Sequence, residues 1–286
     1  MHRARQIAII GMIVSGLLAA LKIAVGGLAH SAALSADGFE SATDVFTSGL
    51  VLVGLKLAAR PADDNHPYGH GRVEIVIGML LGFILVCAGC VIAWRGLTGA
   101  VGIPPAVYAI WPLIISIGAK AWLLVSKYDH GRKIGSSSLI AVAANDAMDI
   151  LSGIVALGAL SLTLVSPARF LRADHYGAFA VGLIVIATAC RVIYDAAMHL
   201  MDTMPDEPSM LKIREVAMSV SEVAGVEKCF ARKTGFKYHV DLHLEVDPDI
   251  TVRASHEIAT RVRDRIRQQL PWVADVLVHV EPFPGL

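Results

Sequence analysis

The sequence has little charge and no excess of either sign. Charged residues make up 17% of its 286 positions, and 25 basic residues balance 25 acidic ones. It contains no basic tract with interleaved aromatic residues, so nucleic acid is not an expected partner. It also lacks a nucleotide-binding glycine loop, an HExxH motif and a Ser/His/Asp order at a plausible place, so we do not expect an enzyme.

Cysteine is also scarce, with four in the whole chain. Cys87, Cys90 and Cys190 fall inside apolar runs, which leaves no room for a disulfide framework or a zinc ribbon. The CxxC of Cys87 and Cys90 is therefore interpreted as small apolar packing residues on a helix.

Apolar residues dominate what is present, at 55% of the chain, an excess that a soluble domain could not cover with polar surface. Long apolar stretches predict six membrane-spanning helices, because about 20 apolar residues cross a bilayer. They lie near residues 7–28, 32–58, 73–98, 104–126, 138–165 and 175–200. The first is too long for a cleaved signal peptide and is read as a span.

Basic residues in the short flanks predict the orientation. Those on the side shared by both termini are Arg3, Arg5, Lys56, Arg60, Arg72, Lys127, Arg132 and Lys133, whereas the opposite side has mainly Arg95, Arg169 and Arg172. The positive-inside rule then places both termini in the cytoplasm. We expect a multi-pass protein of a bacterial-type cytoplasmic (inner) membrane, or of a membrane derived from it.

Composition changes to that of a soluble domain at MPDEP, near Met204 to Pro208. We therefore predict a transmembrane domain over residues 1–204 and a cytoplasmic domain over 205–286. In the tail, periodicity predicts the order helix, strand, strand, helix, strand, a small α+β domain. In one strand Val240, Leu242 and Leu244 alternate with polar residues, the period of a half-buried strand.

Acidic residues stand out in the second and fifth apolar stretches. Asp37, Glu40 and Asp44 are spaced i, i+3 and i+7 along one helix face, and Asn145 and Asp149 lie one turn apart. Carboxylates at bilayer depth are costly, so their clustering indicates an ion pathway or a bound divalent cation. For all of these carboxylates, and above all for Asp37 and Asp146, the alternative is a protonated or water-facing carboxyl that only forms interhelical hydrogen bonds.

Two further sets of residues could bind metal. The loop RPADDNHPYGHGR groups Asp63, His66 and His70, a donor set that suits zinc, although a polar turn is the alternative. The tail residues that could ligate are His239, His243, His256, His279 and Glu281. Spacing alone does not show that they converge.

The combined pattern resembles the cation diffusion facilitator family of metal transporters over nearly the whole chain. Four segments, in the right order, are similar to that family's motifs: SAALSADGFESATDVFTSG, PADDNHPYGHGRVE, SSSLIAVAANDAMDILSG, and DLHLEV followed by VLVHVEP. The loop and the acidic site also resemble the magnetosome-membrane members, which load iron into vesicles.

The resemblance implies a homodimeric antiporter that exports Zn, Mn, Fe or related ions from the cytoplasm in exchange for protons. Each protomer would have six transmembrane helices and a metallochaperone-like, ferredoxin-like tail. The implied metal ligands are Glu40, Asp44, Asn145 and Asp149 for transport, Asp63, His66 and His70 in the loop, and His243, His256, His279 and Glu281 in the tail. The metal would be the substrate and a possible regulator, with no resident cofactor.

Glu40 and Asn145 depart from the family pattern, because Asp or His is usual at both positions. The resulting site has no imidazole and one neutral ligand, which favours Mn or Fe(II) over zinc. Proton coupling would then run through Glu40, Asp44 and Asp149. The same departure motivates an alternative function, a non-transporting scaffold or partner-stabilising paralogue, and a heterodimer with a relative stays open.

Overall fold

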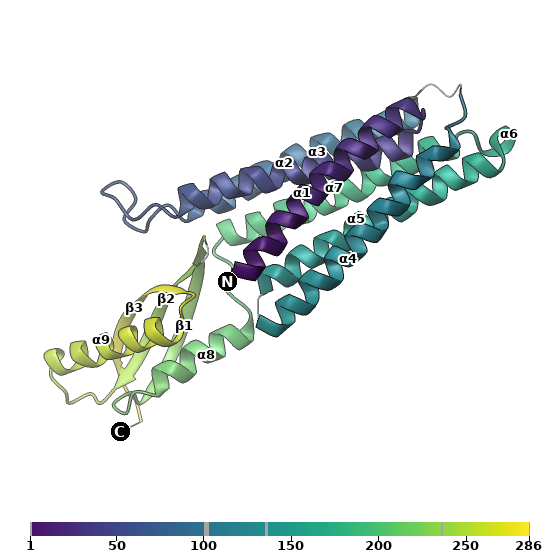
Figure 1. Cartoon of the computed structure of the whole chain (residues 1–286). Helices are drawn as coiled ribbons and strands as arrows, with labels where there is room; N and C mark the ends of the chain where they lie inside the picture. Colours follow the sequence, from purple (N-terminus) through teal and green to yellow (C-terminus); the bar gives the residue numbers. More distant parts are fainter. Residues whose placement is uncertain (1, 100–102, 135–136, 236, 286) are drawn as a thin grey trace. The chain divides into compact units, whose positions relative to one another are not determined.

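A computed structural model of the chain describes residues 2–99, 103–134, 137–235 and 237–285 (Figure 1). Side chains are described for these residues except 2–11, 47–48, 51–52, 55, 131, 133–134 and 137–142. Among the basic residues used for orientation, the side chains of Arg3, Arg5 and Lys133 therefore lie outside the described part. The chain divides into two compact units, residues 1–50 with 80–193, and residues 51–79 with 194–286.

Six helices of 25 to 29 residues match the six apolar stretches in order. They are α1 (His2–Leu28), α2 (Ala32–Ala58), α3 (Arg72–Thr98), α4 (Ile110–Ile134), α5 (Ser137–Val165) and α7 (Ala173–Leu200), with short helical turns η1 (Val107–Ala109) and α6 (Pro167–Phe170). Four segments among the described residues are long and apolar enough to cross a membrane: 72–98, 107–130, 143–165 and 173–200. The number six remains a prediction, since α1 and α2 are not among these four.

Helix α4 runs further than the sequence predicted. The apolar stretch was expected to end near residue 126, yet α4 continues to Ile134 and carries Lys127 inside it. Lys127 is 5% exposed, so it is not a solvated flanking residue as the orientation argument assumed. An ion pair to α5, described below, offsets the cost of burying its ammonium group and lets the helix continue.

Small residues let the helices of the first unit pack closely. Its core combines Ala29 and Ala33 with Leu34, Leu113 and Leu160, each fully buried. Helix α4 packs along α5 and also contacts α1. This packing brings the polar residues of α1, α2, α4 and α5 into one buried region.

Asp174, at the start of α7, fixes the beginning of α2. Its carboxylate accepts hydrogen bonds from Ser31 Oγ at 2.7 Å and from the Ala32 backbone N–H at 2.5 Å. The first N–H groups of a helix have no partner within the helix, so a buried carboxylate there satisfies them and complements the helix dipole. Asp174 thereby stabilises the start of α2, the helix that carries Asp37, Glu40 and Asp44.

The tail has the predicted order: α8 (Glu207–Met218), β1 (Gly225–Thr234), β2 (Lys237–Val246), α9 (Val252–Gln269) and β3 (Val273–Pro282). Strands β1 and β2 are antiparallel, while β2 and β3 are parallel, which requires the crossover through α9. Thr251 caps α9 by accepting the Ala254 N–H at 3.2 Å.

One face of this three-stranded sheet forms the core of the tail. Val240, Leu242 and Leu244 are at most 1% exposed and pack with Ile213 of α8 and Val262 of α9. The alternation predicted for β2 is confirmed, because the polar residues that alternate with these three, including His239 and His243, lie on the opposite face. The predicted α+β class is confirmed, with a small mixed sheet.

We predict that Asp174→Ala lowers the free energy of unfolding by about 2 kcal/mol, because buried donors of α2 lose a charged acceptor. Thermal unfolding of the purified protein in detergent measures this as a lower melting temperature. Asp264→Ala, which removes an exposed carboxylate on α9, is the control and should leave the melting temperature nearly unchanged. Equal melting temperatures for both variants would contradict the role given to Asp174.

Candidate functional site

The acidic residues of α2 and α5 lie in a buried cluster that also contains three lysines. Lys22 of α1 contacts Asp37 of α2 at 2.8 Å, and each side chain is 2% exposed. The same ammonium donates a hydrogen bond to Ser41 at 2.7 Å. Ser152 of α5 donates to the other Asp37 oxygen at 3.4 Å, so three helices meet at this carboxylate.

Two lysines of α4 contact the carboxylates of α5. Lys127 Nζ lies 2.5 Å from Asp146 Oδ2, and Lys120 Nζ lies 3.5 Å from Asp146 Oδ1. Lys120 also forms an ion pair with Asp149 Oδ2. The side chains of all four residues are at most 8% exposed. Asp146 therefore has a cation at each oxygen, and Asp149 shares one of them.

Glu40 and Asp44 complete the cluster from α2. Glu40 is 8% exposed, and its Oε2 is buried without a hydrogen bond to any described residue. It lies within the electrostatic influence of Asp37, Asp44 and Asp149. Asp44 interacts electrostatically with Asp149 and Lys120. Three of the four predicted transport ligands are thus brought to one region, whereas the side chain of Asn145 is exposed.

The carboxylate oxygens of Glu40, Asp44 and Asp149 do not converge on one position in this conformation. Among the described residues, groups of three His, Cys, Asp or Glu with ligand atoms within 4.8 Å of one another occur in the loop and the tail, not at Glu40, Asp44 and Asp149. The charges nevertheless favour a divalent cation. Five carboxylates face three ammonium groups, so with all groups ionised the cluster carries two excess negative charges.

Sequence reasoning did not place Lys22, Lys120 or Ser152 at this site, and it assigned Lys127 to a flank of the membrane instead. A signal was available, since Lys22 and Lys120 interrupt apolar stretches in which an unpaired ammonium would be costly. Such a lysine implies a buried acidic partner. The sequence alternative for Asp37 and Asp146 was a carboxyl that forms only interhelical hydrogen bonds. In the structure both carboxylates form ion pairs with lysines.

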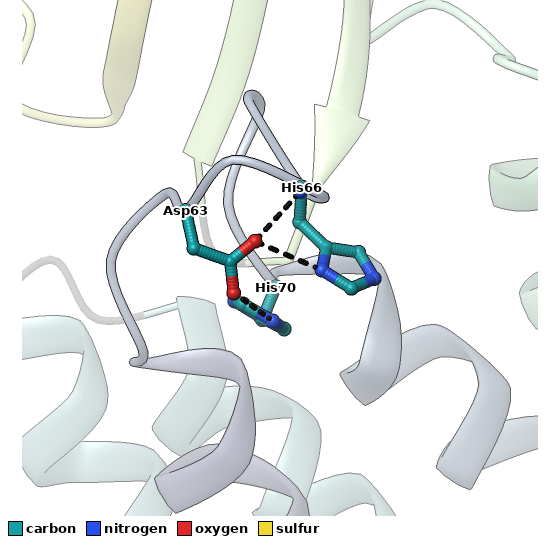
Figure 2. A group of neighbouring side chains, drawn as sticks. All are labelled: Asp63, His66 and His70. Carbon is teal, nitrogen blue, oxygen red and sulfur yellow. Dashed lines mark hydrogen bonds and ion pairs between the residues drawn. The ribbon is translucent and has the colours of Figure 1, made fainter.

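The loop residues Asp63, His66 and His70 form a compact group, in which Asp63 and His66 are exposed and His70 is partly buried (Figure 2). Asp63 Oδ1 lies 3.1 Å from His66 Nδ1, and Asp63 Oδ2 lies 3.4 Å from His70 Nε2. The two imidazole centroids are 4.4 Å apart. All three predicted loop ligands are therefore brought together.

The loop backbone orients these side chains. His70 Nδ1 lies 3.2 Å from the Pro61 carbonyl oxygen, and donation to it leaves Nε2 as the nitrogen that can bind a metal. The backbone N–H of His66 donates to Asp63 and lowers the pKa of that carboxyl. An ionised carboxylate and two imidazoles are a donor set that suits zinc and similar ions.

The tail brings together three of its four predicted ligands on the open face of the sheet. His243 Nδ1 lies 2.6 Å and His279 Nε2 lies 3.5 Å from the same oxygen, Glu281 Oε1. Glu281 accepts hydrogen bonds, first from Glu227 and then from His243, and these lower its pKa. Glu227 of β1 was not singled out from the sequence. His256 is exposed on α9 and is not in the group.

Comparison with known proteins covers both parts of the chain. A family model of the cation efflux transmembrane domain matches residues 8–201, and one of the cation efflux protein cytoplasmic domain matches residues 205–283. The manganese efflux system protein MneP of Bacillus subtilis is 29% identical over 285 residues, covering 98% of this chain and 96% of that protein.

Two further proteins are similar to this chain, one over most of its length and one over the tail alone. The magnetosome protein MamB of Magnetospira sp. is 27% identical, covering 90% of this chain and 88% of MamB. A solved MamM C-terminal domain is 30% identical, covers 27% of this chain and 96% of that domain, and has a TM-score of 0.27.

We predict that Asp63→Ala weakens Zn²⁺ binding at the loop by about tenfold or more, because the carboxylate contacts both imidazoles. Titration of the purified protein with Zn²⁺ measures the change. Asp64→Ala removes the neighbouring exposed carboxylate, which is outside the group, and serves as the control. Equal losses in the two variants would show that the loop contributes only charge.

For the tail, His243→Ala should abolish one Zn²⁺ equivalent, because it removes a nitrogen from the group at Glu281. His256→Ala should keep that equivalent, because its imidazole lies elsewhere on α9. Metal stoichiometry of each full-length variant, measured after dialysis, distinguishes them. Loss of the equivalent in His256→Ala alone would contradict the assignment.

Proposed function

The chain belongs to the cation efflux (cation diffusion facilitator) family, and on that premise we propose that it exports a divalent metal ion in exchange for protons. The observation that carries the proposal is the buried cluster in which Glu40, Asp44 and Asp149 approach one another from α2 and α5. A scaffold would have no need for such a costly arrangement in an apolar unit.

The proposed cycle is alternating access. A metal ion enters from the cytoplasm and is bound by the three carboxylates, with the amide oxygen of Asn145 as a fourth ligand after the helices rearrange. The helix pair then opens to the other side, and protonation of the carboxylates releases the ion. Asn145 cannot take up a proton, so Glu40, Asp44 and Asp149 carry the exchange.

The ion is of the Fe, Mn or Zn class, and Mn or Fe(II) fits the transport site best. Its ligands are all oxygen atoms, which harder ions prefer, and no imidazole is among them. The naming of MneP as a manganese efflux system protein supports the same choice. The loop and tail sites, which contain imidazoles, would instead bind a softer ion such as zinc.

The remaining features of the proposal concern topology and assembly. We place six spans in residues 1–204, a cytoplasmic domain in residues 205–286, and both termini in the cytoplasm, in an inner membrane or one derived from it. The chain would form a homodimer through its tail, or a heterodimer with a relative. Metal bound at His243, His279 and Glu281 would favour one arrangement of the dimer and so adjust transport to cytoplasmic metal.

The alternative function is a non-transporting paralogue that stabilises a partner. It is motivated by Glu40 and Asn145, which depart from the usual ligand types, and by the open arrangement of the ligands. The extent of the similarity to MneP does not favour it.

Flux through the reconstituted protein tests the transporter function. In proteoliposomes with an imposed pH gradient, we expect movement of Mn²⁺ or Fe²⁺ that is abolished by Asp44→Ala and by Asp149→Ala, because each removes a charged ligand. Metal-sensitive dyes inside the vesicles follow the flux. Asp264→Ala, on the exposed face of α9, should transport as the unmodified protein does.

Absence of flux in the unmodified protein, or undiminished flux in both variants, would reject the transporter and leave the scaffold. If metal flux is unchanged when no pH gradient is imposed, proton exchange is rejected while metal transport stands.

A further inference from the structure

Lys120 contacts a proposed transport ligand directly. Its ammonium group reaches from α4 to α5, where it forms an ion pair with Asp149 Oδ2 and lies 3.5 Å from Asp146 Oδ1. It also interacts electrostatically with Asp44. The side chain is 4% exposed, so water does not screen these interactions.

The other two lysines of the cluster are placed differently. Lys22 forms its ion pair with Asp37 and donates to Ser41, and Lys127 contacts Asp146 Oδ2. Among the described residues, the ion pairs and hydrogen bonds of these two lysines involve neither Glu40 nor Asp149. Lys120 is the lysine that forms an ion pair with the proposed transport ligand Asp149.

A metal ion and the Lys120 ammonium compete for the carboxylate of Asp149. A divalent cation bound there would meet a positive charge in a region of low dielectric, where repulsion between like charges is strong. Metal binding therefore favours displacement of the ammonium. Asp146 offers a nearby position, because its Oδ1 faces Lys120 while its Oδ2 is held by Lys127.

We propose that Lys120 is a built-in competing cation, which neutralises Asp149 when no metal is present, shifts toward Asp146 when the metal binds, and returns to Asp149 as the metal leaves. This inference rests on the proposed transport function. The competition lowers the affinity for metal and speeds its release, because the ammonium neutralises Asp149 whenever that carboxylate carries neither metal nor proton. The side chain stays charged throughout, so Lys120 itself adds no proton to the exchange.

Lys120 should therefore lower the affinity for the metal ion and raise the rate of its release. Removing the charge in Lys120→Met should tighten Mn²⁺ binding about tenfold, equivalent to about 1.4 kcal/mol. The half-saturating Mn²⁺ concentration for flux should fall, and the maximal flux should fall with it, because release is slowed. Lys120→Arg keeps the positive charge and should bind Mn²⁺ about as weakly as the unmodified protein.

Mn²⁺ titration and flux of the full-length protein test this, with Asp149→Ala and Lys22→Met measured alongside. Lys22→Met removes an equally buried ammonium that pairs with Asp37 rather than with Asp149 and that also acts electrostatically on Asp44, so it should tighten binding less than Lys120→Met does. The Mn²⁺-induced rise in melting temperature should be larger for Lys120→Met than for the unmodified protein, because the metal then supplies the missing counter-ion. Should Lys120→Met not fold, Lys120→Gln carries the same expectations.

Unchanged or weaker Mn²⁺ binding in Lys120→Met, with binding still lost in Asp149→Ala, would overturn the competing-cation role and leave the transport function intact. Equal tightening in Lys22→Met would also overturn it, since any lost lysine would then have the same effect. If the unmodified protein binds no Mn²⁺ that Asp149→Ala removes, the transport site itself fails, and this inference fails with it.

Discussion

The ion pairs between lysines and carboxylates inside the helical unit are the interactions on which the rest of that unit depends. A carboxylate or an ammonium buried alone would be far too costly, yet paired across α1, α2, α4 and α5 they are tolerated. The pairs also determine where the helices are joined. Lys120 and Lys127 attach α4 to α5 through Asp146, and Lys22 attaches α1 to α2 through Asp37.

The cluster is only partly compensated, and this distinguishes it from a purely structural network. Among the described residues Glu40 Oε2 has no hydrogen-bond partner, and five carboxylates lie with three lysines. A network that served stability alone would gain from satisfying every buried group, because unsatisfied ones cost free energy. With all groups ionised, the excess negative charge of the cluster would instead attract a cation.

Donor chemistry divides the candidate metal sites into two classes. The buried site offers oxygen atoms on rigid helices, whereas the loop and the tail offer imidazoles with one carboxylate at the protein surface. In both surface groups one acidic residue contacts two histidines, Asp63 in the loop and Glu281 in the tail. The two kinds of donor set therefore suit ions of different hardness.

The sequence by itself determined the long helices, the order of the tail elements, the alternation of Val240, Leu242 and Leu244, and the acidic residues of α2 and α5, because periodicity and apolar length are local properties. Only the tertiary structure decided the partners. Lys120 and Asp149 are 29 residues apart, and His243 and Glu281 are 38 apart. No local pattern reports such contacts, so the identity of each lysine's partner, the separation of His256 from the tail group, and the exposure of Asn145 appear only when the helices and strands are packed.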